Sequence, residues 1–170
     1  MPQREVSFTV SATPEELWRF IRNFEALCTC IPGVERIVVV DERTVELTVR
    51  EKIGIVPMII DLRAKIDSED PPRSLRATAR ADHLTMAIDV TLQPNAAGTE
   101  LLTRFDVTGE GQLKSIVDQL FERKATERAA QFAQSLQQRF GVEPVAKPPE
   151  EVRAGWLVRL WRRLLKWIGP

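Results

Sequence analysis

The stretch Gln112–Phe140, QLKSIVDQLFERKATERAAQFAQSLQQRF, decides how the rest of the chain must fold. Its apolar residues recur at spacings of three and four, which is the period of one face of an α-helix. We therefore predict a long amphipathic helix that is gripped by a sheet, with the charged residues, Arg128 among them, on the other faces. The apolar stripe comprises Leu113, Ile116, Val117, Leu120, Phe121, Ala125, Ala129, Phe132, Ala133, Leu136 and Phe140.

The side chains of this stripe are large at both ends and small in the middle, at Ala125 and Ala129. A sheet that contacts the large ends would stand away from the small middle and leave a hollow. The two alanines are equally compatible with close packing of the helix on the sheet. The stripe alone leaves both arrangements open.

The residues before this helix predict strands and two short helices. Thr13-Pro14-Glu15-Glu16 is typical of a helix start, with Thr13 as N-cap and Glu16 completing a capping box. A second short helix from Phe24 to Cys30 ends at Ile31-Pro32-Gly33. Alternating apolar and polar residues predict strands at 6–10, 34–41, 44–53, 56–66, 74–81, 84–92 and 100–108. The expected fold is α+β, with an antiparallel sheet wrapped around a C-terminal helix.

Alternation gives the predicted sheet one apolar face, which the helix would cover. Alanines at 77, 79 and 81 leave room on that face, as do the two alanines of the helix. Glu51 has the inward parity of an otherwise apolar strand, and a buried carboxylate is unfavourable unless it is paired. We therefore expect either a bonded Glu51 at the mouth of a pocket or a bulge near Gly54 that turns Glu51 outward.

Three stretches of this sequence resemble the carbon monoxide dehydrogenase CoxG family, which is part of the START-type helix-grip (SRPBCC) superfamily. They are Pro14-Glu15-Glu16-Leu17-Trp18, then Cys30-Ile31-Pro32-Gly33-Val34-Glu35, then Val49 to Gly54, and the turn at Gly98 also fits. The C-I-P-G tetrad is the most specific of these motifs. In that family the position of Glu51 is more usually apolar, and Cys28 has no place in the motif.

The resemblance implies a helix-grip fold for residues 1–141 and an accessory role beside a molybdenum-containing carbon monoxide dehydrogenase or a related molybdenum hydroxylase. It also implies attachment of that enzyme to the membrane and binding of an isoprenoid quinone, menaquinone or ubiquinone, in the cavity of the grip. We expect no covalently bound cofactor. The expected cavity residues are Phe20, Ile31, Pro32, Val49, Glu51, Met58, Ile60, Leu62, Ala77, Ala79, Met86, Ile88, Phe105, Ile116, Val117, Leu120, Phe121, Ala125 and Ala129.

The last residues differ in composition from the rest of the chain. Residues 1–150 carry 19 Lys and Arg against 23 Asp and Glu, whereas residues 151–170 carry five against one. We expect a proline-rich linker at 142–152 and an amphipathic helix at 153–170 that lies on an anionic membrane surface. Docking on its own domain or on a partner protein is also compatible with such a helix. The expected membrane-binding residues are Trp156, Leu157, Arg159, Leu160, Trp161, Arg162, Arg163, Leu164, Leu165, Lys166, Trp167 and Ile168.

The sequence offers little for catalysis or for a metal site. The closely spaced Cys28 and Cys30 are poorly placed for a disulfide, and the single His83 adds no ligand pair, so we expect free thiols and no structural zinc. We expect neither catalytic residues nor nucleic-acid binding, because the body is acidic and lacks a nucleophile–base motif. The expected location is the cytoplasmic side of the cell membrane. The alternatives are an adaptor that binds no quinone and an enzyme or lipid-binding protein of START type.

Overall fold

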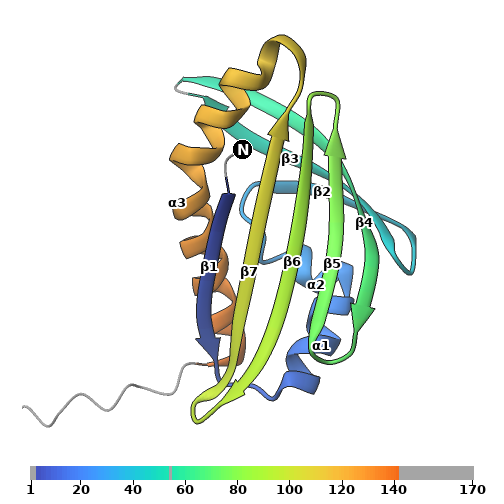
Figure 1. Cartoon of the computed structure of the whole chain (residues 1–170), viewed down its shortest axis with the longest axis vertical. Coiled ribbons are helices and arrows are strands. Elements are labelled where there is room, and N and C mark those ends of the chain that lie inside the picture. The colour runs from blue at the N-terminus through green and yellow to red at the C-terminus, as the bar shows by residue number, and fades with distance from the viewer. Residues whose placement is uncertain (1–2, 54, 142–170) are drawn as a thin grey trace, which may run out of the picture.

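In the computed structural model, which describes residues 3–53 and 55–141, seven antiparallel strands curve around one long helix (Figure 1). The linker predicted at 142–152 and the helix predicted at 153–170 lie outside the described residues. The elements in order are β1 Gln3–Val10, α1 Pro14–Arg22, α2 Phe24–Cys28, β2 Val34–Asp41, β3 Thr44–Ile53, β4 Val56–Asp70, β5 Ser74–Ala81, β6 Leu84–Asn95, β7 Gly98–Gly109, the 3₁₀ turn η1 Gly111–Leu113 and α3 Lys114–Phe140.

The predicted α+β helix-grip fold is confirmed, including the order of its elements. The strands lie in the order β1-β7-β6-β5-β4-β3-β2, so that β1 and β2 form the two edges. Several predicted boundaries are wrong. β4 continues to Asp70 because a register shift between Ile66 and Ser68 breaks the alternation without ending the strand. β6 continues to Asn95, α2 ends at Cys28, and α3 begins at Lys114 after a 3₁₀ turn.

The start of α1 has the predicted capping box. The Thr13 hydroxyl accepts from the backbone N–H of Glu16 at 3.2 Å, and the Glu16 carboxylate accepts from the backbone N–H of Thr13 at 2.9 Å. That backbone hydrogen bond holds the pKa of Glu16 below its usual value. The cap fixes the position of α1, whose Leu17, Trp18 and Phe20 are buried.

One end of the molecule, which we call the closed end, is filled by α1, the last turns of α3 and the strands beside them (Figure 1). Leu136 is fully buried there, and the ring of Phe140 meets the ring of Phe20 edge-on at 5.2 Å. Among the described side chains of α3, Leu136 is the one that is fully enclosed. The buried cluster comprises Val10, Ala12, Leu17, Trp18, Phe20, Ile21, Cys30, Ile66, Leu75, Ala77, Leu92, Leu101 and Leu136.

The opposite end, which we call the open end, contains the β3–β4 hairpin and the first turns of α3 (Figure 1). Ile55 at the hairpin tip is 96% exposed, and Val56 and Ile59 are also exposed. Ile116, which we expected to face the sheet, is 47% exposed, so that prediction is wrong. It lies in the first turn of α3, beyond the region that the closed-end core covers.

We predict that Leu136→Ala lowers the free energy of unfolding by about 3 kcal/mol, because it leaves a cavity in the core that anchors α3. Gln138→Ala, at an exposed site on the same helix, should change it by less than about 0.5 kcal/mol. Urea denaturation followed by far-ultraviolet circular dichroism measures both. Equal losses for the two variants would contradict the assignment of Leu136 as the anchor.

Candidate functional site

The candidate site is the inner face of the sheet where it faces the first half of α3. The α3 backbone approaches β7 and β1 most closely, whereas contact with β3 is made by long side chains. Apolar residues on both sides remain half-buried, so part of each side chain still contacts water. We call six of them the grip surface: Met58, Ile60, Met86 and Ile88 on the strands, and Phe121 and Ala125 on the helix.

The other residues expected in the cavity fall into two groups. Phe20, Ala77 and Ala79 are buried, and the closed-end core includes Phe20 and Ala77. The rest are half-buried, apart from the exposed Ile116 and the buried Glu51. This half-buried group consists of Ile31, Pro32, Val49, Leu62, Phe105, Val117, Leu120 and Ala129. The structure thus separates the expected residues into a filled end and a partly exposed face.

Glu51 points inward, toward α3. The β3–β4 register runs without a shift from Thr44↔Lys65 to Ile53↔Val56 and pairs Glu51 with Met58 on the inner face. The alternative of a bulge that turns Glu51 outward is therefore wrong. The Glu51 side chain is 11% exposed, so its charge needs a partner within the fold.

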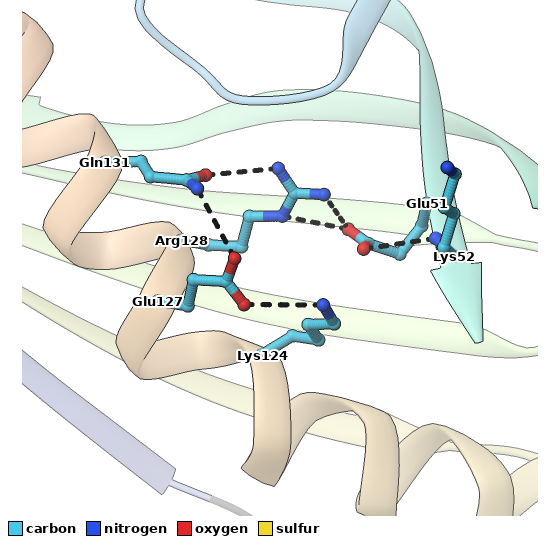
Figure 2. A network of polar contacts seen from close by, with 6 residues as sticks. All are labelled: Glu51, Lys52, Lys124, Glu127, Arg128 and Gln131. Carbon is cyan, nitrogen blue, oxygen red and sulfur yellow. Dashed lines mark hydrogen bonds and ion pairs between the residues drawn. The ribbon is translucent and has the colours of Figure 1, made fainter. Parts of the chain in front are cut away.

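That partner is Arg128 of α3 (Figure 2). Its Nε and Nη2 atoms donate to Oε2 of Glu51 at 3.0 and 2.7 Å, and Nη1 donates to Oε1 of Gln131 at 3.2 Å. The other carboxylate oxygen of Glu51 accepts from the backbone N–H of Lys52 at 3.2 Å. The prediction that Arg128 lies on a solvent-facing side of the helix is wrong. It lies about two turns after Phe121, on the same face, and its long stem reaches the sheet.

The pair belongs to a larger polar network along α3 (Figure 2). Glu127 accepts from Nζ of Lys124 at 3.3 Å and from Nε2 of Gln131 at 3.4 Å. Gln131 therefore connects the Lys124–Glu127 pair to Arg128. Because each cation of α3 in this network has an acidic neighbour, the charges are balanced locally. Within residues 3–53 and 55–141, Arg128–Glu51 is the one ion pair that joins α3 to the sheet.

The turn Ile31-Pro32-Gly33 lies directly beside the pair. Gly33 has a φ of +83°, and its carbonyl accepts from the backbone N–H of Arg50 on β3 at 2.8 Å. A Cβ atom at Gly33 would lie 2.6 Å from the carbonyl oxygen of Arg50 and 3.7 Å from Nη2 of Arg128. Glycine is therefore required by both the backbone conformation and the space. The tetrad that carries the family resemblance thus lies next to the Glu51–Arg128 pair.

The thiols near this turn do not supply reactive chemistry. Cys28 and Cys30 are both free and buried. Burial raises the pKa of the Cys28 thiol to about 11, so this thiol remains protonated at neutral pH. The arrangement can therefore bind and orient a ligand by apolar contact and by hydrogen bonds from Arg128.

Two other hollows lie away from the grip surface. One, of about 590 Å³, lies on the outer face of the sheet and contains the Arg76–Asp89 pair at 2.6 Å and the Arg104–Glu5 pair at 3.0 Å. The other, of about 420 Å³, lies beside the start of α3 between Gly111 and Glu122. No sequence signal marked the first, because its charged residues alternate as on any solvated strand face.

Solved structures with this fold define the class of protein. A START superfamily protein from Mycobacterium smegmatis is 14% identical and has a TM-score of 0.64, with 81% of this chain and 98% of that chain covered. A conserved protein from Geobacillus kaustophilus is 17% identical, with a TM-score of 0.66 and coverage of 81% and 93%. The Zhui aromatase/cyclase from Streptomyces sp. R1128 is 15% identical, with a TM-score of 0.61 and coverage of 81% and 94%. At these identities the likeness shows the fold alone, which is the START-type helix grip.

The sequence pattern of one family then covers most of the chain. Residues 7–141 match CoxG, a family described as a component of carbon monoxide dehydrogenase. The chain therefore belongs to the carbon monoxide dehydrogenase CoxG family, as its C-I-P-G tetrad suggested. No curated protein matches the chain.

We predict that Arg128→Ala lowers the free energy of unfolding by about 3 kcal/mol, because it leaves the carboxylate of Glu51 buried without its partner. Glu51→Ala should have a smaller effect, of about 1–2 kcal/mol, because the Arg128 side chain, 31% exposed, can turn toward water. The double variant should reveal a coupling energy of roughly 1–3 kcal/mol.

The matched control is Glu5–Arg104, a pair of similar length on the outer face with both side chains about half exposed. The same cycle of alanine variants there should give a coupling below about 1 kcal/mol. Urea denaturation of all six variants gives both values. A coupling at Glu51–Arg128 no larger than that of the control would show that the pair does not connect α3 to the sheet.

Proposed function

We propose that this chain is an accessory protein that holds a hydrophobic ligand, an isoprenoid quinone such as menaquinone or ubiquinone, between α3 and the inner face of the sheet. The observation that carries the proposal is the half-buried grip surface beside a buried ion pair. Water in contact with such apolar side chains is unfavourable by about 25 cal/mol for each Å², which a bound lipid would recover. A long isoprenoid chain matches the apolar surface, and a quinone ring matches hydrogen-bond donors at one point on it.

Membership of the CoxG family supports the choice of partner. We propose that the partner is a molybdenum-containing carbon monoxide dehydrogenase or a related molybdenum hydroxylase. In this proposal the oxidoreductase passes electrons to the quinone held by the chain, which connects the enzyme to the respiratory quinone pool. The chain itself serves as a carrier and recruitment factor.

A peripheral location at the inner face of the cell membrane completes the proposal. No helix among the described residues is long and apolar enough to cross a bilayer. Attachment would instead come from the sequence 153–170, where three tryptophans and five cations accompany an apolar face. Each cation near an anionic surface contributes about 1 kcal/mol. The exposed Ile55, Val56 and Ile59 add a second apolar surface at the open end.

An adaptor without a ligand is the second candidate, because the basic and aromatic C-terminal segment alone would suffice for recruitment. A catalytic role, as in the Zhui aromatase/cyclase, would need a general acid or base beside the grip surface. Glu51 is the carboxylate found there among the described residues, and two hydrogen bonds engage it with Arg128. We therefore favour binding over catalysis.

We predict that purified protein incubated with menaquinone retains it, as measured by organic extraction and mass spectrometry. Ala129→Phe should lower the retained quinone by at least about tenfold, because the new ring fills the space between the helix and the sheet. Ala130→Phe, at the adjacent exposed position, should retain as much as the unaltered protein. Uptake that is absent in the unaltered protein, or equal in both variants, would favour the adaptor.

We predict that deletion of residues 150–170 abolishes co-sedimentation with vesicles that contain anionic lipid, because the cations and tryptophans are removed together. Replacing only the three tryptophans by alanine should weaken sedimentation by at least about tenfold. Quinone retention by the deleted protein should be unchanged. Unaltered sedimentation after the deletion would show that the segment does not bind the membrane.

A further inference from the structure

The Glu51–Arg128 pair places a polar group against an otherwise apolar surface. Met58 lies opposite Glu51 in the β3–β4 register, and Phe121 lies about two turns before Arg128 on the same face of α3. A ligand that covers these apolar side chains would therefore bring one of its ends to the guanidinium. This arrangement suits an amphiphile with a long apolar part and a small polar end.

The guanidinium retains capacity for further hydrogen bonds. Its Nε–H, one N–H of Nη1 and one N–H of Nη2 donate to Glu51 and Gln131. The second N–H of Nη1 and the second N–H of Nη2 have no acceptor among residues 3–53 and 55–141. The absent side chain at Gly33 keeps the space beside Nη2 free of a Cβ atom. Arg128 can therefore donate to a ligand without giving up its bonds to Glu51.

The net charge of the pair decides which ligand oxygen can accept those bonds. Glu51 neutralises Arg128, and Lys124 is likewise neutralised by Glu127 at 3.3 Å. A carbonyl oxygen accepts a hydrogen bond and brings no charge, so it suits this neutral environment. A carboxylate or phosphate would meet the carboxylate of Glu51 at close range, where the effective dielectric constant is low and like charges repel strongly.

Stability alone gives no reason for a buried ion pair at this position. Replacing such a pair by well-packed apolar side chains is often neutral or stabilising. The network of Figure 2 holds the guanidinium in place from two elements, through Glu51 on β3 and Gln131 on α3. That fixed orientation is what the recognition of a carbonyl oxygen requires.

We infer that Arg128 is the residue that binds the carbonyl oxygen of an uncharged lipid, and that Glu51 positions Arg128 and excludes anionic lipids such as fatty acids. This inference rests on the proposed function, since it names the class of ligand that the grip surface accepts. Glu51 acts through Arg128 and does not itself contact the ligand. The site thus discriminates between lipids by their charge.

Equilibrium dialysis against decylubiquinone and against dodecanoate tests the inference. The unaltered protein should bind decylubiquinone at least about tenfold more tightly than dodecanoate. Glu51→Gln keeps the shape of the side chain and removes its charge, so the affinity for dodecanoate should rise about tenfold while that for decylubiquinone changes little. Arg128→Met should weaken decylubiquinone binding by about tenfold.

Further variants separate recognition from structure. The gain for dodecanoate should vanish in the double variant Glu51→Gln/Arg128→Met, because the cation that attracts it is gone. Glu5→Gln and Arg104→Met, which alter the outer-face pair, should leave both affinities unchanged. If Glu51→Gln does not fold, the preference of the unaltered protein and the effect of Arg128→Met still decide.

The outcomes distinguish this inference from the function on which it rests. Binding of decylubiquinone with no change of preference in Glu51→Gln would overturn the inference and leave the proposed function standing. Equal affinity of the unaltered protein for the two lipids would overturn it as well. Failure to bind either lipid would overturn both.

Discussion

A single α-helix is too narrow to cover a seven-stranded sheet. Seven strands at a spacing of about 4.8 Å span roughly 29 Å, whereas a helix with its side chains is about 10–12 Å across. The sheet meets this constraint by curving around α3, and α1 and α2 cover more of its inner face. The closed end satisfies the constraint with buried side chains such as Leu17, Leu101 and Leu136. Toward the open end the same constraint leaves apolar side chains half-buried, and the grip surface is its result.

The Glu51–Arg128 pair follows from the same geometry. Where the α3 backbone stands away from β3, a short apolar side chain could not reach across, but a long arginine can. The carboxylate that receives it needs only a strand position with inward parity, which Glu51 has. Gly33 completes the arrangement, because its backbone fits against β3 where a side chain would collide with the carbonyl of Arg50. Fold, turn motif and polar site are therefore one continuous set of contacts.

The sequence was sufficient for the order of elements and for the START-type fold. Alternation and capping are local signals, so Thr13, Glu16 and the strand parities could be assigned correctly. Alternation fixes the face on which a residue lies but not its distance from the opposing element. For this reason it could not decide between a buried Phe20, a half-buried Phe121 and an exposed Ile116. Arg128 was missed because its charge outweighed its position, two turns after Phe121. The bulge after Ile66 ended the pattern before it ended the strand.

The twenty-seven residues of α3 also set a lever length. At 1.5 Å per residue the helix measures about 40 Å, and it carries the chain from the open end to Gly141 at the closed end. The next ten or so residues, rich in proline, can extend to about 31 Å. A body tethered at Gly141 can therefore stand with its exposed hairpin tip well clear of the tethering surface, or lie down and touch it. The same tether allows loading at one surface and delivery at a distance from it.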